Sequence, residues 1–262
     1  GNNRREISAD SVVTQIDSVL IANNQTDRTV SQYTANTNYR YQKNNNTFNI
    51  DLDFGRFNND GKTNQPNEYF TEDGIPLSSV ITSYTTPRVI DIYTGKIDYE
   101  TEALGGKIGI GSKYGVVSSD NTFLFNDVID GEEIQNNLRS NQFDYNETVI
   151  AGYVSYNRSL SDKVSISTGV RVENTDSKGE LMAFIPELQE APVDTNYTNL
   201  FPTLGISFQY APMHSFSANY GRRINRPDYN VLNPFKEQKS ILSFSKGNPF
   251  LRPEIVNNVE MG

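Results

Sequence analysis

The sequence has no cysteine, no tryptophan and only one histidine, His214, among its 262 residues. Without thiols there is no disulfide framework, no cysteine-ligated zinc and no thiol nucleophile. A single imidazole also argues against a Ser-His-Asp triad and against a multi-histidine metal centre. His214 follows Pro212 and Met213 in a short polar stretch, where an exposed ring is the ordinary expectation. These absences exclude several classes of enzyme and metalloprotein.

Long apolar runs and positive charge are also scarce. No window approaches the roughly 18 consecutive apolar residues of a spanning helix, which excludes a helical membrane protein. Lys and Arg number 23 against 32 Asp and Glu, a formal charge of −9 that argues against nucleic acid as a partner. The mean hydropathy of −0.58 is low for a water-soluble core. Yet the 15 Tyr and 14 Phe exceed what a disordered polar chain carries.

The strongest pattern is the alternation of apolar and polar residues in segments of about ten residues, which is the period of a half-buried strand. Between Phe48 and Gly55, for example, aromatic and aliphatic residues alternate with Asn and Asp. In 149–158 both faces carry apolar groups, so the facing of that segment stays open. The alternation predicts eight strands, near 33–41, 48–55, 90–99, 106–116, 149–158, 164–173, 203–210 and 215–221.

The connections between these segments alternate between short and long. Short turns at one end and long loops at the other describe an up-and-down antiparallel meander, and a transmembrane β barrel has this asymmetry. We therefore predict a single all-β unit over 1–262, with about eight strands across 27–262. It would be part of a β barrel or curled into one, with all long loops on one edge. The expected long loops are 58–88, 118–147, 174–200 and 222–258.

In the first segment of the chain the apolar residues have helical spacing and do not alternate. Val12, Ile16 and Leu20 fall near helical spacing, and Asp10 is available as an N-cap. Residues 1–26 are therefore predicted to form a loop or a short amphipathic helix.

The last part of the chain contains three motifs: YGRRINRP at 220–227, NPF at 233–235 and GNPFLRPE at 247–254. This run resembles the barrel region of TonB-dependent outer-membrane receptors, especially the outer-membrane β-barrel family common in Bacteroidetes. The segments 143–159 and 164–179 are also similar to that family. The resemblance implies an outer-membrane location and TonB-dependent uptake of a scarce ligand such as a siderophore, vitamin or glycan. Outer-membrane lipid and the TonB system would be the partners.

The resemblance covers 91–262 and leaves parts of the family pattern unmatched. The family's plug domain and TonB box have no counterpart in these residues, and its barrels have about 22 strands. We therefore expect a slice of a receptor barrel without its plug. Such a slice has two open edges and a lipid-facing stripe, which favours curling into a smaller barrel or self-association.

Arg222, Arg223 and Arg226 lie close together within the first motif. They would either pair with the abundant Asp and Glu of neighbouring strands, and so hold loop geometry, or face a carboxylate of a ligand. Pairing is the simpler expectation, because acidic residues outnumber basic ones.

Two acidic sets are candidate sites. Carboxylate and amide oxygens suit Ca²⁺, but the loop acids lack the twelve-residue calcium-loop spacing, so solvated acids are expected instead. Carboxylates on one strand face also suit glycosidase chemistry, although a polar lumen needs such charges anyway. The loop set comprises Asp127, Asp130, Glu132, Glu133 and the expected turn Asn58, Asn59, Asp60, Gly61; the strand set comprises Asp51, Asp53, Asp98 and Glu100.

We accordingly assign no catalytic, cofactor-binding or metal-ligating residue, and the ligand-binding residues stay open. The leading function is that of a receptor fragment and not of an enzyme. The alternative is a self-contained soluble or surface β barrel or sandwich that binds a ligand or carbohydrate. The full coding sequence separates the two, because only a receptor requires a plug and further amphipathic strands.

Overall fold

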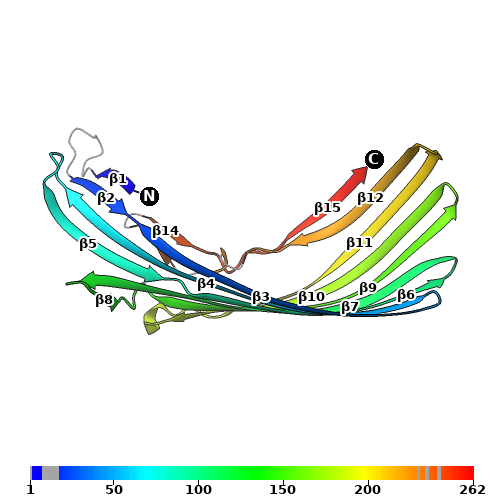
Figure 1. Ribbon diagram of the computed structural model, residues 1–262, viewed down its shortest axis with the longest axis horizontal. Helices are drawn as coiled ribbons and strands as arrows, with labels where there is room; N and C mark the ends of the chain where they lie inside the picture. Colours follow the sequence, from blue (N-terminus) through cyan, green and yellow to red (C-terminus); the bar gives the residue numbers. More distant parts are fainter. Residues whose placement is uncertain (1, 8–17, 229–230, 234–235, 241–242) are drawn as a thin grey trace.

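The computed structural model describes residues 2–7, 18–228, 231–233, 236–240 and 243–262. Thirteen antiparallel strands form one bowed sheet, and β13 and β14 form a separate hairpin (Figure 1). A short 3₁₀ turn, η1, lies at Pro186–Leu188 between β10 and β11. None of the described residues forms a helix long and apolar enough to cross a membrane.

Each predicted segment lies within an observed strand that is longer than predicted. The observed strands are β1 (Asn2–Ile7), β2 (Ser18–Asn23), β3 (Gln25–Lys43), β4 (Asn46–Phe70), β5 (Pro76–Thr85), β6 (Arg88–Ala103), β7 (Gly106–Ile129), β8 (Glu132–Gln135), β9 (Asn141–Ser161), β10 (Val164–Ala183), β11 (Val193–Ala211), β12 (His214–Asn225), β13 (Lys236–Ser240), β14 (Ser243–Lys246) and β15 (Glu254–Met261).

The predicted antiparallel meander is confirmed. The eight predicted strands are β3, β4, β6, β7, β9, β10, β11 and β12, and each pairs with the next in this order. β15 then pairs with β12. The short turns lie where the alternation places them. At 104–105 both central residues have positive φ, 57° and 73°, as a two-residue turn matched to the twist of its strands requires.

Strand register determines the two faces of the sheet, because directly paired residues point to the same side. One row crosses β7, β9, β10 and β11 and is apolar throughout; the adjacent row points the other way and includes Tyr153 and Arg171. This answers the open question about 149–158, since Val154 lies in the apolar row. The apolar row consists of Ile110, Val154, Val170 and Pro202.

The face opposite the apolar rows is the concave one. The segment that joins β12 to β15 lies inside the bow of the sheet (Figure 1). From this segment Leu232 packs in a buried cluster with Phe143 and Tyr145 of β9 and Leu181 of β10. These β9 residues are on the same face as Tyr153, so the apolar rows are on the convex side.

The long connections do lie at one edge, but the prediction that they are loops is wrong for much of their length. β4, β7 and β10 run on to Phe70, Ile129 and Ala183, and β5 and β8 are additional strands within the expected loops. Apolar alternation ends where neither face of the sheet meets an apolar medium, whereas the backbone ladder continues beyond that level. The sequence pattern therefore shows where alternation stops and not where the strand stops.

The N-terminal prediction is corrected in part. Residues 8–17 lie outside the described residues, but 18–23 form strand β2 and not a helix or loop. β3 pairs with β4 only up to Asn64, so the rest of that edge of β4 is free to pair with β2 at 67–70. Val19 and Leu20 are buried there, 4% and 3% exposed.

No pairing among the described residues joins β15 to β1 or β3, so the sheet is open and has not curled into a smaller barrel. The convex face carries the large exposed apolar side chains along the paired strands. They include Leu52, Tyr93, Ile97, Ile110, Tyr114, Ile150, Val154, Leu204 and Val259.

The two faces of β9 can be tested with one substitution on each. Val154→Arg places a charge on the convex face and should lower the free energy of unfolding in phospholipid bilayers by about 2–4 kcal/mol. Ser155→Arg, one residue along and on the concave face, should cost less than about 1 kcal/mol. Equal losses in urea titrations of the two reconstituted variants would show that the faces have been assigned wrongly.

Candidate functional site

The lower part of the concave face is a hydrogen-bonded polar wall. As predicted, Asp51, Asp53, Asp98 and Glu100 share this face, and β4 and β6 hold them at alternate positions. Each has a donor: Asn38 donates to Asp51, Thr94 Oγ1 to Asp53 at 2.8 Å, and Tyr153 Oη to Asp98. Lys107 pairs with Glu100 at 2.6 Å. These carboxylates are engaged as structural acceptors of a polar lining.

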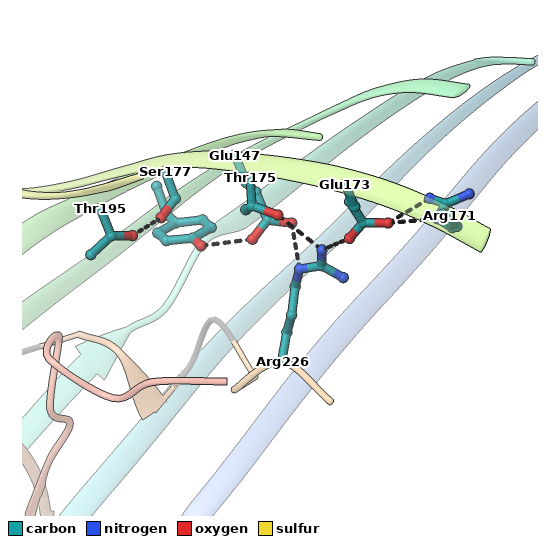
Figure 2. A network of polar contacts seen from close by, with 8 residues as sticks. Glu147, Arg171, Glu173, Thr175, Ser177, Thr195 and Arg226 are labelled. Atoms are coloured by element: carbon teal, nitrogen blue, oxygen red, sulfur yellow. Dashed lines mark hydrogen bonds and ion pairs between the residues drawn. The ribbon is translucent and has the colours of Figure 1, made fainter. Parts of the chain in front are cut away.

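Higher on the same face, Arg226 reaches across the sheet to two glutamates (Figure 2). Its Nη2 donates to Glu173 of β10 and, at 3.0 Å, to Thr175 Oγ1. Its Nε lies 3.8 Å from Glu147 Oε1 of β9. Arg171 donates to the other oxygen of Glu173, with 2.9 Å from Nε to Oε2. Two guanidinium groups and two carboxylates therefore form one network.

Neutral side chains form further hydrogen bonds beside the ion pairs, on β9, β10 and β11. Tyr145 Oη donates to Glu147 Oε2 at 3.0 Å, and Ser177 and Thr195 share a hydrogen bond of 2.6 Å (Figure 2). Glu147 and Glu173 are only 6% and 5% exposed. Buried carboxylates need such partners, because an unpaired buried charge is costly.

The path of β12 explains how Arg226 reaches β9 and β10. β11 and β12 pair only from the turn up to Thr203 and Gly221, and above that point β11 pairs with β10 alone while β12 pairs with β15 alone. The end of β12 is therefore free to cross β11 on the concave side. On the convex side, Thr148 and Asn174 lie beside the two glutamates along their strands, so the network lies at the level where that face turns polar.

Arg226 stays charged in this setting. Burial lowers the pKa of its guanidinium, but the hydrogen bond and charge of Glu173, together with the charge of Glu147, raise the pKa by more. The guanidinium therefore acts as a permanent cation that neutralises buried carboxylates.

Residues 231–233, which lead into the second sequence motif, are hydrogen-bonded to residues 247–248, at the start of the third, above this network. Gly247 N donates to Asn233 O at 2.8 Å, and Asn248 N donates to Val231 O at 2.7 Å. A Cβ at Gly247 would lie 2.5 Å from Val231 O, so the close approach requires glycine. We call residues 231–233 and 247–248 the clasp. It closes the base of the excursion that carries β13 and β14.

Beside the clasp, a small cavity of about 40 Å³ separates the β12–β15 segment from the sheet. This space suits a water molecule but no larger ligand. Its lining includes Tyr145, Tyr197, Arg226, Leu232, Pro249 and Leu251. The segment is therefore packed against the concave face and narrows the space inside the bow.

The three motif arginines divide into two kinds. Arg226 pairs with acids of neighbouring strands, as expected. Arg222 and Arg223 form no ion pair with any described residue, and they line a separate cavity between β11 and β12.

The structure distributes the loop acids and does not gather them. Glu133 pairs with Lys62 at 2.7 Å, and the hydrogen bond from Lys62 lowers the pKa of Glu133. Asp127 accepts a hydrogen bond from Asn136 at 2.7 Å, Asp130 lies at a turn with φ of 54°, and Glu132 begins β8. The described residues contain no group of three or more side chains suited to a metal ion.

The expected turn at 58–61 is wrong, because these residues lie inside β4 and pair with 28–31 of β3. The polar residues Asn58, Asn59 and Asp60 suggested a turn, but the backbone hydrogen bonds to β3 continue through them. His214 is the first residue of β12, directly after the two-residue turn, and is exposed as predicted.

Sequence reasoning missed the acceptors of Arg226. Glu173 already stood on the polar face of its predicted strand, so its inward position was available from alternation. Glu147 was assigned to the end of a loop, and nothing in the local sequence indicates that β9 begins six residues earlier.

A bowed antiparallel sheet with an apolar convex face and an ion-paired concave face is the wall of an outer-membrane β barrel. The sequence comparison agrees: residues 39–262 match the outer membrane protein beta-barrel family, and the chain belongs to this family. It is therefore a protein of the outer membrane.

Two solved structures are similar to the chain at low identity. The unliganded ferric citrate transporter FecA has a TM-score of 0.48 and 12% identity, with 79% of this chain and 39% of that chain covered. The ferric yersiniabactin uptake receptor FyuA from Yersinia pestis has a TM-score of 0.48 and 10% identity, with 94% and 46% covered. The chain thus spans less than half of either structure. A search of curated proteins found no match.

We predict that the ion-pair network around Arg226 contributes to the free energy of unfolding. Arg226→Ala leaves Glu147 and Glu173 short of a cation in a buried site and should lower the free energy of unfolding by about 3–5 kcal/mol. Lys246→Ala is the matched control, because Lys246 pairs with Glu190 at 3.4 Å in an exposed position and should matter by less than about 1 kcal/mol. A loss for Arg226→Ala no larger than that of the control, in urea titrations of the intact protein, would refute the role of the network.

We also predict that the clasp depends on the absence of a side chain at Gly247. Gly247→Ala should push apart the two crossing backbones and cost about 1–3 kcal/mol, with faster hydrogen exchange at the amides of 247 and 248. Gly152→Ala is the control, since nothing lies within 4 Å of its added methyl group. Unchanged exchange at both amides in Gly247→Ala would show that the clasp does not hold the segment.

Proposed function

We propose that this chain is a segment of the barrel of a TonB-dependent outer-membrane receptor that takes up a scarce ligand, such as a siderophore, vitamin or glycan. The 262 residues would form a single barrel segment of the type common in Bacteroidetes. The plug and TonB box that such transport requires would come from other parts of the receptor. Its partners would be outer-membrane lipid, the TonB system and the ligand.

The covered concave face is the observation that carries this proposal. The β12–β15 segment is packed onto the wall by Arg226, Leu232 and the residues around the clasp. Barrels of 16–18 strands that act as porins keep an open aqueous channel, whereas 22-stranded transporters have a filled lumen. An inward segment with a buried ion-pair network favours the second type.

The alternative of a self-contained soluble binding module has less support. The convex face exposes an unbroken series of Ile, Leu, Val and Tyr side chains across neighbouring strands. In water such a patch is an aggregation hazard, whereas in lipid it is the required surface. Membership in the outer-membrane family points the same way.

Uptake measurements test the proposal directly. Cells that lack the gene and cells that lack TonB should both lose accumulation of the same ligand when labelled siderophores, cobalamin and oligosaccharides are compared. Both should regain it when the missing gene is restored. Passive uptake that survives the loss of TonB would identify the protein as a porin and contradict the proposal.

A further inference from the structure

Arg222 is a charged residue on the face of the sheet that meets lipid. Arg222 and Arg223 are neighbours on the regularly paired strand β12, so their side chains point to opposite faces. Tyr220 is paired with Leu204 of β11 and with Val259 of β15, and this row belongs to the apolar convex face. Arg222 is two residues further along β12 and shares the convex side, whereas Arg223 is on the concave side.

The surroundings of Arg222 place it near the level of the lipid headgroups. Along the convex face of β12 it lies between Tyr220 and Ile224. Its direct partner on β15 is Asn257, whose Oδ1 accepts a hydrogen bond of 3.0 Å from Tyr220 Oη. Tyrosine rings are enriched where hydrocarbon meets water. The guanidinium therefore lies at the border of the hydrocarbon, among side chains that carry no charge.

Another convex arginine shows how such a charge can be neutralised. On β4, Arg56 follows the aromatic residue Phe54 on the convex face, as Arg222 follows a tyrosine on β12. The Nε and Nη2 of Arg56 donate to the two carboxylate oxygens of Asp91 on β6, each at 2.6 Å. In contrast, Arg222 forms no ion pair with any described residue, and its Nε is buried without an acceptor among them. A buried donor in this state is costly, so protein, water or ligand usually satisfies it.

The separation of β12 from β11 leaves space beside the guanidinium of Arg222. Above Gly221, β12 is paired with β15 alone, and a cavity of about 480 Å³ lies in the gap between β12 and β11. This volume is within the range of small-molecule sites. The lining includes residues of both faces, among them Tyr220, Arg222 and Ile224 on the convex side. A headgroup can therefore reach Arg222 from the lipid side.

We propose that Arg222 binds the phosphate group of an anionic membrane lipid whose headgroup enters the gap between β11 and β12. The phosphate takes the place that the carboxylate of Asp91 has beside Arg56, because a guanidinium fork fits two oxygens of either group. The acyl chains lie over Leu204 and Val259, which are 58% and 64% exposed in the next convex row toward the turn. The site requires that the convex face meets lipid, and it does not require TonB-dependent uptake.

Tryptophan fluorescence can measure the lipid composition beside Arg222, because these 262 residues contain no tryptophan. In the intact receptor, Val259→Trp adds a fluorophore next to the site. Ile110→Trp adds one to the convex face of β7, which β9, β10, β11 and β12 separate from β15. Each variant is reconstituted into phosphatidylcholine vesicles with a minor fraction of phosphatidylglycerol whose brominated chains quench tryptophan, and the signal of the parent protein is subtracted.

Quenching at residue 259 should indicate an enrichment of phosphatidylglycerol of about fivefold over residue 110, which is the preference that one arginine near the membrane surface provides. The formal charge of the chain is −9, so a preference for an anionic lipid at one position is local and not a general attraction. Equal quenching at the two positions would overturn the proposal.

Three variants in the Val259→Trp background assign the enrichment to one side chain, provided that circular dichroism shows native β structure. Arg222→Gln should reduce the enrichment at residue 259 to the level of residue 110. Arg223→Gln is the matched control, because it removes the same charge from the concave face and should leave the enrichment unchanged. Arg222→Lys keeps the charge without the planar fork and should keep part of the enrichment. An equal effect of Arg222→Gln and Arg223→Gln would contradict the site.

Inorganic phosphate distinguishes a lipid from a soluble anion as the source of the phosphate group. Enrichment at residue 259 should be the same in phosphate and chloride buffers of equal ionic strength, because the lipid is also held by its chains. Loss of enrichment in phosphate alone would assign the site to free phosphate and overturn the lipid proposal. These measurements do not involve TonB, so failure of the lipid site and failure of TonB-dependent uptake are observed separately.

Discussion

The structure depends on one constraint: within hydrocarbon every backbone N–H and C=O must be paired inside the protein. Strands meet this constraint only by pairing with neighbours on both sides, and antiparallel neighbours need only short turns at alternate ends. Because side chains alternate along a strand, the same ladder places every second residue toward lipid. The low hydropathy, the abundance of aromatic residues and the acidic charge all follow from this division into two faces.

The concave face has a constraint of its own, because its carboxylates are partly removed from water. Glu147 and Glu173 lie on neighbouring strands and are nearly buried. Arg171 of β10 pairs with Glu173, so a second cation from outside these two strands is needed to balance both carboxylates. Arg226 meets that need only because β12 leaves β11 at Gly221. The same separation gives the packed β12–β15 segment, the buried ion pairs and the cavity between β11 and β12. One change in strand pairing thus accounts for the main features of the interior.

Alternation alone predicted the strands that cross the apolar level, their order and their short turns. It also placed Asp51, Asp53, Asp98 and Glu100 on one face. It did not predict the partners of Arg226, because Glu173 is 53 residues away in sequence and the contact depends on how far β12 bends. The strand extensions at 58–70 and 118–129 were missed for a different reason. Residues 58–65 are polar or glycine on both faces, and 123–125 are apolar on both faces, so neither stretch has a signal of period two, although the backbone pairs as regularly as before.

The two faces of this sheet meet different media, and spin labels can detect the difference. The natural chain has no cysteine in these 262 residues, so single cysteines can be introduced one at a time from 164 to 173 on β10 and spin-labelled in the reconstituted protein. We predict that accessibility to oxygen, which is concentrated in lipid, is high at Ile166, Val170 and Val172. Accessibility to a water-soluble paramagnet should instead be high at Ser165, Ser167 and Gly169, which lie on the opposite face. Access of the water-soluble reagent to both sets, without a period of two, would show that the two faces meet the same medium.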